Sequence, residues 1–194
     1  MPIAINGSGT VTGISVGGLP DGIVDTDMLA ANAVTAAKRG AGAILQVVTN
    51  TITGANNIAS DAEDPTASGL ITTVTTKGSG SSFIVSSVGA NPHCNSSASN
   101  AAVKFLLYAS INSGTYANVF GSEPFQAYHT TTSWVDFPGP WTVHVTGLSY
   151  TVGQTIAFQP YYQEGESSST NYFHHTGGSG GTGKIRLTVQ EVAA

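Results

Sequence analysis

Short stretches in which apolar and polar residues alternate recur from residue 44 to the end of the chain, and they limit the fold more than any other feature. Residues 141–145 (WTVHV) and 185–189 (IRLTV) are the clearest cases. Successive side chains of a β-strand point to opposite faces, so this alternation predicts strands with one buried face. Gly, Pro, Asn and Ser separate the stretches, which is typical of a sandwich or a barrel.

The same pattern predicts further strands at residues 45–52, 69–77, 82–88, 103–109 and 155–162. The second and third of these would form a hairpin across Gly78-Ser79-Gly80. The fourth is apolar at both alternating sets of positions, which favours a central strand. In the last, Ile156 and Phe158 are expected to point inward.

The predicted fold class is therefore mainly β. Residues 44–194 would form a C-terminal antiparallel β-sandwich, jelly-roll-like, and 151 residues suffice for eight strands. An extended N-terminal arm and a short helix or linker would precede it. No helix of more than two turns is expected within the sandwich.

The first 24 residues are predicted to be an arm that docks onto another protein of the assembly. Turn signals such as Pro20-Asp21-Gly22 interrupt a weak alternation. A flexible tail is the alternative, but the Ile and Val content favours ordering against a partner chain. The expected docking residues are Ile3, Ile5, Val11, Ile14 and Val16.

Residues 25–43 have the features of a short helix. Asp25, Thr26 and Asp27 offer an N-cap and favourable charges at its start, and Gly40 suits the position after its end. A helix of about three turns is marginal alone, so its small apolar face would pack against copies of itself. An extended linker is the alternative. The expected trimerisation residues are Met28, Leu29, Ala33 and Ala36.

Composition excludes several classes of function. Charged residues make up 9% of the chain, against about 25% in ordinary globular proteins. With six Lys and Arg residues and a net charge of −5, no basic patch for nucleic acid or for an anionic membrane can form. Cys94 is alone, so no intrachain disulfide is expected. No signal peptide and no long apolar run are seen, and we expect no membrane insertion.

The residues that could carry chemistry do not form a catalytic pattern. His174 and His175 are adjacent, so one strand would direct them to opposite faces, although three copies of one histidine could hold a metal on a trimer axis. His93 and Cys94 lack an orienting third group. The acidic run that begins at Asp61 lacks the spacing of a calcium loop. We therefore expect no enzyme activity and no cofactor.

Aromatic residues gather in the second half of the chain, many of them in stretches rich in Gly, Pro, Ser and Thr. Aromatic side chains on the loops of a sandwich are typical contacts for sugars or for neighbouring subunits. Core packing explains a share of them. The expected glycan contacts are Tyr128, Trp134, Tyr161 and Tyr162.

Both ends of the chain resemble small virion structural proteins of tailed bacteriophages, especially cyanophage-like tail fibres, capsid fibres and decoration proteins. The segments that carry the resemblance are 5–38 (INGSGTVTGISVGGLPDGIVDTDMLAANAVTAAK), 42–48 (GAILQVV), 150–158 (YTVGQTIAF) and 187–194 (LTVQEVAA). The middle, roughly residues 50–140, is not covered. Tail fibres often repeat the NAVTAAK-like unit, which occurs once here, so a short adaptor, a capsid fibre or a decoration protein is as compatible as a long fibre.

The resemblance implies a non-enzymatic virion protein, made in the host cytoplasm. The arm would anchor to a capsid or tail protein, the chain would form a homotrimer, and the sandwich would project outward or cement capsid neighbours. A module that binds host-surface carbohydrate is the alternative function. A polysaccharide depolymerase is a third, although such an enzyme needs paired carboxylates that nothing in the sequence places together.

Overall fold

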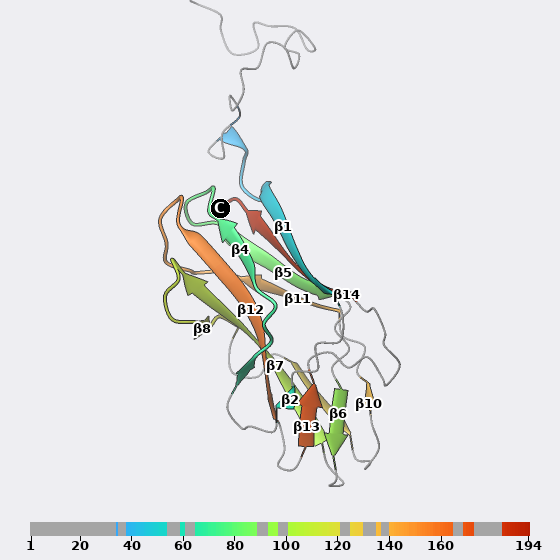
Figure 1. The fold of residues 1–194 in the computed structure, drawn as a ribbon. Helices are drawn as coiled ribbons and strands as arrows, with labels where there is room; N and C mark the ends of the chain where they lie inside the picture. Colours follow the sequence, from blue (N-terminus) through green and yellow to red (C-terminus); the bar gives the residue numbers. More distant parts are fainter. Residues whose placement is uncertain are drawn as a thin grey trace, which may run out of the picture.

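A computed structural model describes residues 34, 38–53, 59–60, 65–88, 93–96, 101–120, 125–129, 135–136, 140–164, 169–172 and 184–194. The predicted docking residues and trimerisation residues lie outside these ranges. The described residues form β-strands joined by turns and loops (Figure 1). This part of the chain contains no helix that is long and apolar enough to cross a membrane.

Two antiparallel sheets face each other. The first has the order β1 (Ile44–Thr53), β14 (Lys184–Val192), β5 (Ser82–Val88) and β11 (Trp141–Val145). The second has β3 (Thr66–Ala67) and β4 (Thr72–Thr75) beside β12 (Thr155–Glu164), then β7 (Ala101–Ile111), then β8 (Ala117–Asn118) and β9 (Phe125–His129).

A small third sheet lies at the end of the molecule away from the start of β1 (Figure 1). Its strands, in order, are β10 (Val135–Asp136), β6 (His93–Ser96), β13 (Ser169–Tyr172) and β2 (Ala59–Ser60).

The connections between the two main sheets are those of a jelly roll. In the described residues, the two main sheets have eight strands when β8 and β9 are counted as one and β3 is counted with β4. Numbered one to eight in chain order, these are β1, β4, β5, β7, β8/β9, β11, β12 and β14. The sheets then read 1-8-3-6 and 2-7-4-5. Jelly rolls are eight-stranded double sheets of this kind. The predicted antiparallel β-sandwich is thus confirmed.

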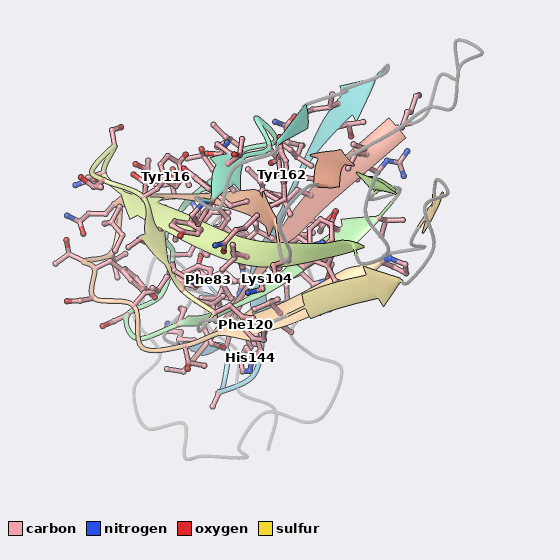
Figure 2. All side chains as sticks on the ribbon, turned by 90° about the horizontal axis from the view of Figure 1, so that it is seen from below. Phe83, Lys104, Tyr116, Phe120, His144 and Tyr162 are labelled. Atoms are coloured by element: carbon pink, nitrogen blue, oxygen red, sulfur yellow. The ribbon has the colours of Figure 1, made fainter. Side chains whose placement is uncertain are left out.

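The core fills the space between the two sheets. Each main strand contributes alternate side chains, such as Phe83 and Val85 from β5 and Ile156 and Phe158 from β12, all of them fully buried. The Phe83 ring lies 5.3 Å from that of Phe158 and 5.8 Å from that of Tyr150, edge-on to the latter. Figure 2 shows Phe83 in the middle of the sandwich.

The alternation predicted the inward face of several strands correctly. In β11, and in β14 as far as Gln190, the apolar positions are buried and the polar ones face outward; at the end of β14 this reverses, with Glu191 buried and Val192 outward. Ile156 and Phe158 point inward as expected. β7 is central, because β12 pairs with one of its edges and β8 and β9 with the other.

The predicted hairpin across Gly78-Ser79-Gly80 is wrong. β4 pairs with β12 in one sheet, whereas β5 pairs with β14 and β11 in the other. The chain therefore crosses between sheets at this turn. Val74 and Phe83 both point into the core from opposite sides, which a hairpin within one sheet would not allow.

Glu191 fixes this crossing. Its carboxylate is completely buried. It accepts hydrogen bonds from the backbone N–H groups of Lys77 and Gly78, at 2.8–3.0 Å, and from the Gln46 side-chain amide in β1. The turn packs closely at Gly78, because a Cβ atom would lie 2.5 Å from Ser81 Oγ and 2.7 Å from a Leu45 methyl, so a larger residue would make these two side chains move. The crossing turn, β1 and β14 are thereby tied to one buried group.

Replacing Glu191 by Ala should lower the free energy of unfolding by about 3 kcal/mol or more. The substitution leaves buried donors without an acceptor, and each such donor costs about 1–3 kcal/mol. Urea denaturation of the variant measures this loss. Lys184→Ala, an exposed site in the same strand, is the control and should change stability by less than about 0.5 kcal/mol. Equal stabilities of the Glu191 variant and wild type would contradict the assigned role.

Tyr162 should make the fold sensitive to alkali. Burial raises the pKa of its hydroxyl to about 12, so the folded chain keeps this proton at a pH where the unfolded chain has lost it. The resulting stabilisation is complete below about pH 10 and is lost as the pH rises to about 12. Tyr162→Phe cannot ionise, so its unfolding free energy should fall less steeply across this range, by about 1.4 kcal/mol per pH unit. Denaturation series at several pH values compare the slopes, and equal slopes would contradict this.

Candidate binding surface

Three tyrosines gather on the outer face of the sheet that contains β7 and β12. Tyr108 in β7 and Tyr161 in β12 stack with their ring centroids 4.1 Å apart and their planes at 26°. Tyr116, just before β8, lies 6.2 Å from Tyr161 at 48°. All three side chains are half-buried. We call Tyr108, Tyr116 and Tyr161 the tyrosine cluster.

Strand register brings the stacked pair together. Tyr108 lies opposite Gln159, and Leu106 lies opposite Tyr161. The two tyrosines are therefore diagonal neighbours across two strands, a distance that aromatic side chains can bridge. Their neighbours in sequence, Leu107 and Tyr162, point into the core, so the tyrosines face away from it.

A tight turn places Tyr116 beside the pair. Asn112 and Ser113 have φ values of 50° and 60°, and positive φ at both central residues is the mark of a type I′ hairpin turn. The Asn112 side chain accepts a hydrogen bond from Thr155 N at 3.3 Å, while its own backbone N–H donates to Thr155 O. The turn is thereby fastened to β12, the strand that carries Tyr161.

The hydroxyl groups of Tyr116 and Tyr161 stay protonated further into alkaline conditions than an ordinary phenol does. Partial burial raises the pKa of Tyr116, and proximity to Tyr161 raises it further. Burial, followed by proximity to Tyr108, likewise raises the pKa of Tyr161. At neutral pH both phenols are therefore neutral groups that can donate and accept hydrogen bonds.

Neutral side chains flank the rings, with the buried Leu106 opposite Tyr161 and amides on both sides of Tyr108. Tyr108 lies between two amide residues in the strand register. Gln159 in β12 is opposite it on one side and is buried, and Asn118 in β8 is opposite it on the other. Among the side chains described on the strands of this sheet, Lys104 alone carries a charge. The surface thus offers aromatic rings, hydroxyls and amides, which suits a ligand that is both hydroxylated and partly apolar.

One predicted glycan contact lies in this cluster and another does not. Tyr161 is on the outer face, as a contact residue must be. Tyr162 is wrong as a contact, because its side chain is completely buried in the core. The side chains of Tyr128 and Trp134 lie outside the described part of the chain, as do His174 and His175, so their assignments stay predictions.

Tyr108 and Tyr116 were not predicted from the sequence as partners of Tyr161. The alternation of residues 103–109 could have placed Tyr108 on the outer face, because it lies on the side of the strand opposite to Phe105, Leu107 and Ala109. Tyr116 had a weaker one in the Asn112-Ser113-Gly114 turn, which could have indicated a hairpin.

No metal centre is seen in the described residues, where no three His, Cys, Asp or Glu side chains come together. In sequence, no protein-family model matches the chain and no curated protein is significantly similar to it. The fold and the surfaces themselves therefore carry the functional argument.

Proposed function

We propose that this chain is a non-enzymatic structural protein of a bacteriophage virion, in which three copies assemble. The N-terminal segment would anchor each copy to capsid or tail, and the jelly roll would project from the particle. The observation that carries the assembly part is an exposed aliphatic surface on the β1–β14–β5–β11 sheet. The resemblance of both chain ends to phage virion proteins supports the virion part.

The aliphatic surface lies on the outer side of the sheet that begins with β1. Ile44 pairs with Val192, and in the next row Val47 pairs with Gln190, which pairs with Ile84. Ile44 and Val47 are 52% and 56% exposed, and Val88 further along β5 is 58% exposed. We call this outer surface of β1, β14, β5 and β11 the assembly face. The row Thr49–Thr188–Ser86 separates Val88 from Ile44 and Val47, so the aliphatic residues gather at the Ile44 end of the face. Neighbouring exposed aliphatic residues are a feature of interaction sites.

A second copy of the chain fits the assembly face better than a charged partner. Two pairs of hydroxyl side chains cross it, Thr49 with Thr188 at 2.9 Å and Ser86 with Thr142 at 3.0 Å. Hydroxyls both donate and accept hydrogen bonds, so the same surface can meet itself. Its described charged or titratable groups are Lys184, Arg186 and His144, and the first two lie at the end of β14 away from the Ile44–Val192 pair.

The position of the face also favours association of chains that are joined through the segment before β1. Residues 38–43 lead directly into β1 at Ile44, and Gly42 N donates to Ala193 O just beyond β14. Chains joined through residues 25–43 would therefore bring these ends of their assembly faces close to one another. Figure 1 shows β1 and the C-terminus side by side at this end of the domain.

Light scattering after size-exclusion chromatography should find a homotrimer, with three times the 19.7-kDa chain mass. Val47→Glu puts three carboxylates into the assembly face, and like charges brought together oppose association by several kcal/mol. We expect this variant to shift towards monomer at micromolar concentration. Thr73→Glu, exposed on the other sheet, is the matched control and should stay trimeric. A stable wild-type monomer would contradict the assembly proposal.

Antibodies against the purified protein should label intact particles of the phage that encodes it, because the domain projects outward from its anchor. Immunogold electron microscopy shows whether the label lies on capsid or tail, and antibody preabsorbed with the protein is the control. Particles that carry neither label nor the chain by mass spectrometry would rule out a virion role.

A further inference from the structure

We propose that the tyrosine cluster is a binding site for a neutral oligosaccharide. This goes beyond the structural role above, because it assigns a ligand class to the sheet face opposite the assembly face. The two proposals are independent, since a virion protein need not bind sugar and a sugar-binding domain need not trimerise.

The aromatic groups suit the apolar side of a sugar ring. A pyranose face carries axial C–H groups, which pack on tyrosine rings while the sugar hydroxyls bond to nearby polar groups. Tyr rings combine an apolar body with a polar tip and have only two side-chain torsions to fix on binding. Three such rings from β7, β12 and the segment before β8 lie within 6.2 Å of a neighbour.

The electrostatics select a neutral ligand. Gln159 and Asn118 flank Tyr108 with amides, and the raised pKa values of Tyr116 and Tyr161 keep their phenols uncharged. One lysine, Lys104, is the only charged group among the described side chains of this sheet. A single cation does not make a site for a polyanionic sugar, which clusters of Arg and Lys would bind.

The site is held in place before any ligand arrives. The Tyr108–Tyr161 stack spans two central strands, and the Asn112 turn is hydrogen-bonded to β12. A surface that is already ordered loses less entropy when it binds. A loose group of aromatic loop residues would lack this advantage.

The cluster remains accessible when the assembly face is covered. Figure 2 shows Tyr116 and His144 on opposite sides of the sandwich, with Phe83 between them. His144 is exposed on β11, within the assembly face, whereas Tyr116 contacts Tyr161 on the other sheet. A homotrimer built through the assembly face therefore displays three tyrosine clusters outward.

A printed array of neutral and acidic bacterial oligosaccharides, probed with the full-length protein, tests the proposal. We expect binding to neutral chains, and titration calorimetry with the strongest of them gives the affinity. Tyr116→Ala should weaken it about tenfold, which corresponds to the loss of one aromatic contact. Tyr161→Phe keeps the ring and should weaken it less. Val152→Ala, an exposed loop site, is the control and should bind as wild type does.

Three results would overturn the proposal. One is the absence of binding to any neutral oligosaccharide by wild-type protein. Another is binding that Tyr116→Ala and Tyr161→Phe leave unchanged while their melting temperatures match wild type, which would place the sugar elsewhere. The third is a change of oligomeric state in Tyr116→Ala, which would make the cluster a subunit contact. Because light scattering reports assembly separately, failure here leaves the structural proposal standing.

Discussion

The buried carboxylate of Glu191 joins three parts of the chain that must meet before the sandwich can close. β14 supplies the carboxylate, β1 supplies Gln46, and the Lys77–Gly78 backbone supplies the donors at the point where the chain leaves one sheet for the other. A buried charge that loses its partners costs several kcal/mol, so this contact favours one path for the crossing turn. The position of β5 beside β14, and with it the place of Phe83 in the core, follows from that path.

Once the crossing is set, the main strands direct one set of alternate side chains into the core between the sheets and the other set outward. The inner faces of the two sheets are alike, because aliphatic and aromatic residues from both sheets pack together there. The outer faces differ from each other. One has exposed Val and Ile among paired hydroxyls, and the other has stacked tyrosines among amides. Since core packing does not determine the outward positions, their contrast is the best guide to what the molecule contacts.

Much of this could be predicted from alternation alone, and the exceptions have physical causes. The inward faces of β11, β12 and β14 follow from periodicity of two, and the same phase would have placed Tyr162 inside with Ile156 and Phe158, and Glu191 inside with Val189. The Gly78-Ser79-Gly80 turn could not be resolved in this way, because a glycine-rich turn suits a hairpin and a crossing equally. The tyrosine cluster needed strand register, since Tyr108 and Tyr161 are 53 positions apart in the sequence and become neighbours only when β7 pairs with β12.

The separation of the two outer faces gives the two proposals a joint consequence. A single tyrosine cluster is small and shallow, and three half-buried rings supply little binding energy. Under the two proposals, three clusters displayed by one trimer, and many trimers on one particle, would act on a repetitive polysaccharide at high effective concentration, so that weak contacts would add up to firm attachment. A protein that used the same sheet for assembly and for ligand would lose this gain, because subunit contacts would cover the site. Placing aliphatic residues on one sheet and tyrosines on the other avoids that conflict within a single jelly roll.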